Sequence, residues 1–175
     1  GKTYILRKFG EQEYQKFAFF SLDRNLKVRE VFEKGESTAD IIMALSAISQ
    51  VDITPGDTLV VLDEIQDCPK ALEALKFFCE ETPDIHIIVA GSLLGLSLHN
   101  GVSYPVGKVE ELRLYPMSFL EFLNAMNKTQ LLSIIVNKNW TVINMLEKDL
   151  ISLLRQYYYV GGMPAAVLAH AEQKG

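Results

Sequence analysis

The chain opens with Gly1, Lys2 and Thr3, three residues whose types and order suit the binding of phosphate. In a phosphate-binding loop the glycine lets the backbone approach the phosphates, the lysine neutralises their charge, and the threonine hydroxyl ligates Mg²⁺. The residues that follow, 4–9, predict a helix with apolar side chains on one side, and the N-terminus of a helix attracts anions. A Gly-Lys-Thr triplet also occurs on ordinary protein surfaces, so a second feature has to support it.

Two adjacent carboxylates, Asp63 and Glu64, end an apolar run that begins at residue 58. Phosphoryl transfer needs one carboxylate that holds Mg²⁺ and a second group that orients or deprotonates the attacking water. We predict that Asp63 faces the metal and that Glu64 orients the water. The alternative is two solvated acids at the point where a strand reaches the surface.

A third polar side chain, Ser92, ends the next apolar run at "VAGS". Ligands of open α/β sheets bind outside the carboxyl ends of the strands, where Asp63, Glu64 and Ser92 are all expected. Ser92 is therefore a candidate contact for the terminal phosphate of a nucleotide, with capping of the following helix as the alternative. Together the three positions and the opening triplet predict a site for ATP and Mg²⁺, in which Lys2 and Glu64 are catalytic and Thr3 and Asp63 ligate the metal.

The elements that would position these residues alternate along the chain. Apolar runs predict buried strands at 16–22, 58–64, 85–92 and 109–117, and helical spacing predicts helices at 37–49, 69–81 and 118–126. Strands that are apolar on both faces and separated by helices imply a parallel sheet covered on both sides. From about residue 128 onward the pattern is helical only. We predict an α/β core over 1–126 and a helical segment over 127–175.

The composition limits the class of protein. Half of the residues are hydrophobic (49%), 22% are charged, and the net charge of -5 favours neither a broad nucleic-acid surface nor an anionic membrane surface. Cys68 and Cys79 are too few for a disulfide scaffold and lack the spacing of a metal site, so we expect both to be reduced and to face the core. No apolar run is long enough to span a bilayer, and we expect a cytoplasmic protein that does not contact membranes.

Four segments occur in an order that resembles the prokaryotic AAA-type ATPases: "TLVVLDEIQDCP", "IIVAGSLLGLSL", "GKVEELRLYPMSFLEFL" and "YYYVGGMPAAV". The resemblance implies a P-loop NTPase fold, a three-layer α/β sandwich with a parallel sheet, followed by a helical, winged-helix-like segment and a C-terminal domain. It also implies that Gly1, Lys2 and Thr3 finish the phosphate loop, that Asp63 and Glu64 form the acidic motif, and that Ser92 is the first sensor. The chain departs from the family at Lys108, where arginine is usual, and at Ala165, where glutamate is common.

The resemblance implies a Mg²⁺-dependent ATPase that acts as a molecular switch. We expect the first strand and the earlier part of the phosphate loop to lie upstream of Gly1, so that the natural protein extends upstream, and downstream as well, and the 175 residues alone are inactive. Two alternatives are a nucleotide-dependent interaction module that does not hydrolyse ATP and a DNA-binding regulator. A protein partner, DNA and oligomerisation are open, and Arg113 and Arg155 are candidate arginine fingers. We interpret His86 as a packed, hydrogen-bonded residue and residues 157–159, "YYY", as packing.

Overall fold

The computed structural model describes residues 1–91 and 107–173, which form two compact units, Lys2–Leu112 and Arg113–Gly175. The first is an α/β unit and the second is a helical unit, and each is described by itself. These units are defined by the contacts within them, whereas a domain boundary concerns independent folding and evolution. The predicted domain boundary after residue 126 therefore stays a prediction.

The α/β unit is built on a parallel sheet of three strands in the order β1-β2-β3 among the described residues. These strands are β1 (Lys16–Ser21), β2 (Thr58–Asp63) and β3 (His86–Ala90). In the register Ser21 lies opposite Asp63, which lies opposite Ala90, so the three strands end together at one edge of the sheet. The predicted parallel sheet is therefore confirmed, and its carboxyl edge carries Asp63.

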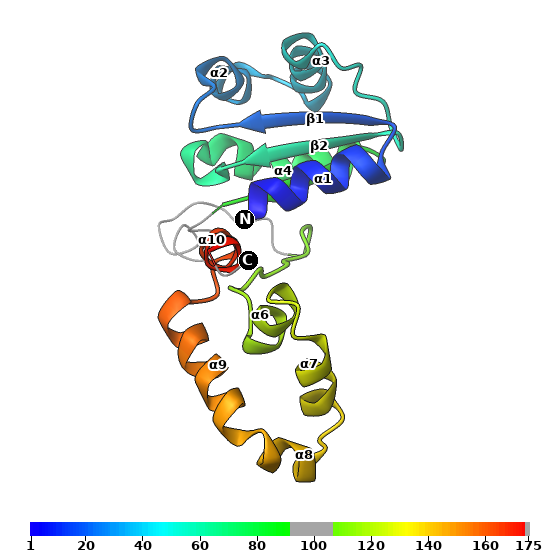
Figure 1. Ribbon diagram of the computed structural model, residues 1–175. Helices are drawn as coiled ribbons and strands as arrows, with labels where there is room; N and C mark the ends of the chain where they lie inside the picture. The colour runs from blue at the N-terminus through cyan, green and yellow to red at the C-terminus, as the bar shows by residue number, and fades with distance from the viewer. Residues whose placement is uncertain (92–106, 174–175) are drawn as a thin grey trace. The chain divides into compact units, whose positions relative to one another are not determined.

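Three helices cover one face of this sheet: α2 (Leu26–Lys34), α3 (Thr38–Ser49) and α4 (Pro69–Glu81). Figure 1 shows α2 and α3 on one side of the strands and α1 on the other. The main hydrophobic core lies under the three helices, where alternate strand residues such as Phe20, Val60 and Leu62 meet helix residues such as Phe32, Leu45 and Leu75.

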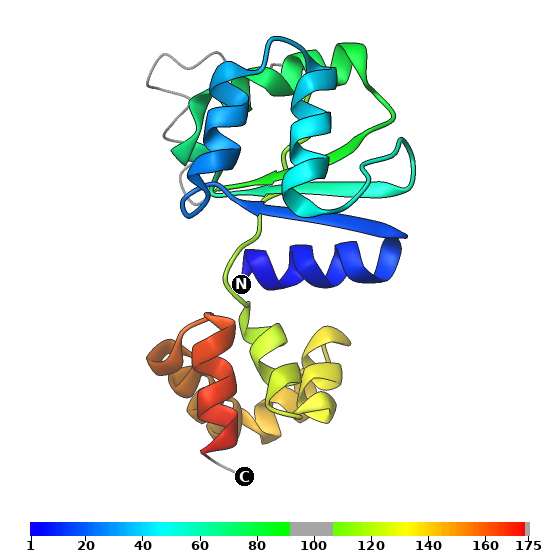
Figure 2. The same ribbon diagram turned by 90° about the horizontal axis from the view of Figure 1, so that it is seen from above.

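The opposite face of the sheet packs against α1 (Lys2–Glu13), the helix that begins within the amino-terminal Gly-Lys-Thr triplet. A side-chain carbon added at Gly10 would come within 2.2 Å of the Phe17 ring, so glycine lets α1 lie close to β1. The Arg7 guanidinium lies 3.7 Å from the centre of the Phe19 ring, a cation–π contact. This packing holds the start of α1 at the carboxyl edge of the sheet, and helices on both faces give the predicted three-layer α/β fold (Figure 2).

Residues at the helix starts explain where α2, α3 and α4 begin. The Ser37 hydroxyl accepts a hydrogen bond from the Asp40 backbone N–H at 3.1 Å, which confirms the predicted cap of α3, and Pro69 occupies the first turn of α4 as predicted. Helix α2 was not predicted. Its signals are a cap at Asn25, whose side chain accepts from the Val28 N–H at 3.3 Å, and the pair of Glu30 and Lys34 at 2.8 Å.

The helical unit consists of α6 (Phe119–Ala125), α7 (Thr129–Val136), α8 (Trp140–Met145), α9 (Glu147–Val160) and α10 (Pro164–Glu172). Helix α6 begins with a capping box, in which Ser118 and Glu121 each bond the other's backbone N–H. These hydrogen bonds from Ser118 lower the pKa of the Glu121 carboxyl. No strand occurs among the described residues from 113 to 173, so a winged-helix arrangement is not evident in this part of the chain.

The "GGMP" segment and the "YPMS" segment join at Met117. The Met117 backbone N–H donates to the Gly162 carbonyl at 2.7 Å, and the Tyr157 hydroxyl donates to the Met117 carbonyl at 2.8 Å. Tyr157 also packs against the rings of Phe119 and Phe122. Two segments about 45 residues apart in sequence are thus tied together through the backbone of Met117.

We expect Gly162→Ala to destabilise the helical unit by about 1–3 kcal/mol, the usual cost of inserting a methyl group into close-packed structure. A side-chain carbon at Gly162 would lie 2.3 Å from the Met117 carbonyl oxygen, and backbone cannot move aside as a flexible side chain can. Urea denaturation followed by tryptophan fluorescence reports this unit, because Trp140 lies on α8. Ala166→Ser, which likewise adds one heavy atom but on the exposed surface of α10, is the control. Equal stability of Gly162→Ala and the parent would contradict the close approach.

Three sequence-based predictions are wrong. Residues 109–117 form no strand, because no described strand pairs with them, and Leu112 in this segment is 89% exposed. His86 is exposed at the start of β3 and contacts the Tyr14 ring edge-on instead of lying hydrogen-bonded in the core. Cys79 is exposed on α4, whereas Cys68 is buried as predicted, and burial raises the pKa of its thiol.

None of the helices formed by the described residues combines the length and the apolar character that crossing a bilayer requires.

Candidate functional site

The amino-terminal triplet and the acidic pair meet at the carboxyl edge of the sheet. The Thr3 hydroxyl, in the first turn of α1, donates a hydrogen bond to Asp63 Oδ2 at 2.7 Å, across sixty residues of sequence. Two segments predicted separately to bind one nucleotide are therefore in direct contact. A hydroxyl and a carboxylate held side by side are oxygen ligands of the type that Mg²⁺ prefers.

Asp63 is almost fully buried, with 4% of its surface exposed. Its Oδ2 accepts from Thr3, and its Oδ1 accepts from the Glu64 backbone N–H at 3.1 Å. A buried carboxylate is costly unless both oxygens find partners, and these two donors supply them. They also fix the direction of the carboxylate, so the side chain is pre-oriented at the edge of the sheet.

Glu64 follows in a backbone conformation that side-chain-bearing residues seldom adopt. Its φ of 56° and ψ of 50° lie in the left-handed region, and the chain turns there from β2 into a short 3₁₀ helix, η1 (Ile65–Asp67). Such residues concentrate at functional sites, where the surrounding structure offsets a cost of order 1 kcal/mol. The Glu64 carboxylate accepts a hydrogen bond from the Gln66 side-chain amide at 2.6 Å. Glu64 is therefore held by its backbone and by a neighbouring side chain.

Polar residues at the end of β1, which the sequence analysis did not single out, share this edge. Leu22 donates its backbone N–H to the Asp63 carbonyl at 2.9 Å, which continues the β1–β2 pairing past Ser21. The Ser21 hydroxyl donates to the Asp23 carboxylate, and this hydrogen bond lowers the pKa of Asp23. The sequence signal for these residues was the change from apolar to polar residues in "FAFFSLD". The same kind of change identified Asp63 at the end of β2.

The other predicted site residues have simpler placements. Lys2 is half-buried in the first turn of α1, adjacent in the chain to Thr3, and Gly1 immediately precedes that helix. Ser92 lies outside the described residues. Lys108, which stands where the resembling family has arginine, pairs with Glu80 on α4 at 3.5 Å.

Thr3 and Asp63 fit a magnesium ion that is shared with a nucleotide. No group of three or more His, Cys, Asp or Glu side chains suited to a metal occurs within the described residues. Mg²⁺ in phosphoryl-transfer sites does not need such a group, because water and substrate phosphates supply most of its ligands and the protein adds one or two oxygens. The donor set is therefore suited to Mg²⁺ with a bound triphosphate and poorly suited to a metal held by protein alone.

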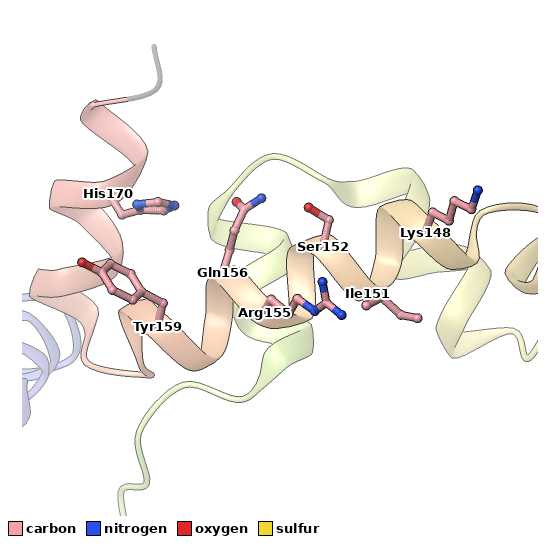
Figure 3. A pocket seen from close by; sticks show the side chains of 7 residues that line it. All are labelled: Lys148, Ile151, Ser152, Arg155, Gln156, Tyr159 and His170. Carbon is pink, nitrogen blue, oxygen red and sulfur yellow. The ribbon is translucent and has the colours of Figure 1, made fainter.

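A separate cavity of about 550 Å³ lies in the helical unit along α9 and against α10 (Figure 3). Its lining includes two cations, Lys148 and Arg155, two turns apart on the same face of α9, together with Tyr159 and His170. Among the described residues no carboxylate lines it, so these residues supply neither the acidic ligands nor the water-orienting group that ATP hydrolysis requires. This cavity is suited to an anionic group and is distinct in chemistry from the edge of the sheet.

Comparison with known proteins identifies the family of the chain. Residues 1–123 match a family model described as an AAA domain, and the matched range includes the amino-terminal triplet, the three strands and the acidic pair. Searches of curated proteins and of solved structures gave no match. Because the match spans more than half of the 175 residues, the chain belongs to the AAA domain family of nucleotide-binding, ATPase-like modules.

Proposed function

We propose that the protein binds ATP with Mg²⁺ at the carboxyl edge of the sheet, hydrolyses it, and works as a molecular switch for a partner or for further domains. The observation that carries this proposal is the hydrogen bond of 2.7 Å from the Thr3 hydroxyl to the Asp63 carboxylate. It joins the end of a phosphate-binding motif to the carboxylate expected to share its metal.

Each residue at this edge of the sheet has a different role in the hydrolysis of ATP. Thr3 and Asp63 hold Mg²⁺, directly or through water, and Lys2 neutralises charge on the outer phosphates. When bound, the metal stabilises negative charge on the phosphate oxygens. Glu64 orients a water molecule toward the terminal phosphorus and accepts its proton, as the bond from that phosphorus to the bridging oxygen breaks to leave ADP and inorganic phosphate.

The direct test measures phosphate release from ATP by the purified full-length protein, with Mg²⁺ and with the metal removed by a chelator. The proposal requires turnover with Mg²⁺ and none in the chelator. ATP binding without turnover would instead support the nucleotide-dependent interaction module, and the absence of both would reject the site.

A second candidate function, DNA binding by the helical unit, is favoured by the charge distribution. Residues 113–175 carry six basic and four acidic side chains, whereas residues 1–112 carry eleven basic and eighteen acidic ones. Two of the six cations, Lys148 and Arg155, line the cavity on α9.

If DNA phosphates bind this cavity, Lys148→Ala combined with Arg155→Ala weakens DNA binding by the full-length protein and reduces the slope of log affinity against log salt by about 1 to 2. Fluorescence anisotropy at several salt concentrations measures this slope. Lys138→Ala, on the exposed α7–α8 turn, is the control. Unchanged salt dependence in the double variant would remove this candidate.

A further inference from the structure

We propose that Gln66 is a positioning residue that fixes the carboxylate of Glu64 for its work on the attacking water. This inference rests on the proposed ATPase function and deepens it. The amide of Gln66 donates a hydrogen bond of 2.6 Å to Glu64 Oε2, one of the shortest side-chain contacts in the α/β unit. Its contact with the neighbouring Asp67 carboxylate is much longer, at 3.4 Å. The stronger interaction of Gln66 is therefore with Glu64.

The local backbone makes this contact possible. Glu64 adopts the left-handed conformation and η1 begins directly after it, which turns the side chains of residues 64 and 66 toward each other. The Glu64 backbone N–H is held by Asp63 Oδ1, so the base of the side chain is tied to the metal-binding carboxylate. The Gln66 amide then restrains the far end. Glu64 is thereby fixed at both ends relative to Asp63.

The orientation of the Gln66 amide is set by the same contact. Its Oε1 is buried and has no hydrogen-bond partner in the described structure, a cost that a surface glutamine would avoid by turning toward solvent. Turning the amide over would place this oxygen against the Glu64 carboxylate, where two acceptors repel. The hydrogen bond to Glu64 thus offsets the free-energy cost of leaving Gln66 Oε1 without a partner. With Oε2 engaged by Gln66, Oε1 of Glu64 is the oxygen we assign to the attacking water.

The first test replaces Gln66 with methionine, which has a similar length and lacks the donor. In the full-length protein we expect Gln66→Met to lower kcat for ATP about 10- to 100-fold, the usual effect of misplacing a catalytic group, and to change the affinity for ATP by less than threefold. Asp67→Asn, which alters only the longer contact of Gln66, serves as the matched control and keeps kcat within twofold. Thermal unfolding of each variant verifies that it is folded.

The second test measures the chemical step and the binding of ATP separately. We expect phosphate release under single-turnover conditions to fall in Gln66→Met, while titration of a fluorescent ATP analogue gives the affinity of the parent. A purely structural role would weaken ATP binding and slow turnover together.

The outcomes separate this inference from the proposed function. If Glu64→Gln stops turnover while Gln66→Met keeps kcat within twofold of the parent, Glu64 is catalytic and the role of Gln66 is rejected. If Glu64→Gln leaves turnover unchanged, the catalytic role of Glu64 is rejected, and the inference about Gln66 is rejected with it. A parallel loss of ATP binding and turnover in Gln66→Met would also overturn the inference.

Discussion

Glu64→Gln lowers the turnover number for ATP by at least about 100-fold in the full-length protein and leaves ATP binding intact. The substitution keeps the size of the side chain, and the amide oxygen can still accept the hydrogen bond from Gln66 at the position of Oε2. It removes the negative charge and the basicity needed to take a proton from water, a contribution of about 10²–10⁴ in rate. Phosphate release under single-turnover conditions measures this change in the chemical step.

The binding half of this prediction needs a separate measurement and a control. Fluorescent ATP analogues titrated into each variant report affinity, and we expect the parent and Glu64→Gln to agree within threefold. Glu36→Gln, an exposed residue between α2 and α3, is the matched substitution far along the chain from the site. Unchanged turnover in Glu64→Gln would eliminate Glu64 as the catalytic base.

Asp63→Asn removes the magnesium dependence of ATP binding and lowers turnover by at least about 100-fold, because a neutral amide cannot replace the charge of a metal-ligating carboxylate. The amide can still accept from the Thr3 hydroxyl through its oxygen. In the parent protein the Glu64 backbone N–H donates to Asp63 Oδ1 at 3.1 Å. In Asp63→Asn the NH₂ group of the new amide takes the place of that oxygen and faces the same N–H. Two buried N–H donors that face each other without an acceptor lower the free energy of unfolding by about 1–3 kcal/mol.

The affinity for ATP, measured by calorimetry with and without Mg²⁺, tests this prediction. We expect Mg²⁺ to strengthen ATP binding by the parent and to have no effect on Asp63→Asn. Asp57→Asn, an exposed residue just before the opposite end of β2, is the matched control. If Asp63→Asn responded to Mg²⁺ as strongly as the parent, Asp63 would not ligate the metal.

The sheet and its edge could be predicted because their signals are local. Runs of β-branched and aromatic residues identified β1, β2 and β3, and β1 and β2 end in the polar residues Ser21 and Asp63. The contact between Thr3 and Asp63 followed from a general property of parallel sheets, whose strands end at one edge. The sequence could therefore bring Thr3 and Asp63 to one edge of the sheet without knowing any distance.

The errors occurred where tertiary structure decides the outcome. Residues 109–117 have a strand-like pattern, but a strand requires a partner edge, and sequence spacing carries no information about one. His86 was interpreted from its apolar neighbours, although the first residue of a strand at the end of a sheet can be exposed. Helix α2 was missed because its apolar face is short, with Val28 and Phe32 as its buried residues.

The contact between Gln66 and Glu64 could not be predicted, because it depends on the backbone conformation of Glu64. In a helix, side chains two residues apart face different directions, and in a strand they share a face but lie roughly 6.5–7 Å apart along it. Here the left-handed conformation at Glu64 brings the side chains of residues 64 and 66 into contact. No sequence pattern in "LDEIQ" predicts that conformation.

The central claim is that Thr3 and Asp63 converge on one Mg²⁺ bound to the triphosphate of ATP. A crystal structure of the full-length protein with Mg²⁺ and a non-hydrolysable ATP analogue tests it most directly. We expect the Thr3 hydroxyl oxygen at about 2.0–2.1 Å from the metal, with Asp63 bound to the metal or to one of its waters and Glu64 facing the terminal phosphate. A nucleotide and metal bound elsewhere, with the hydrogen bond from Thr3 to Asp63 unchanged, would contradict the claim.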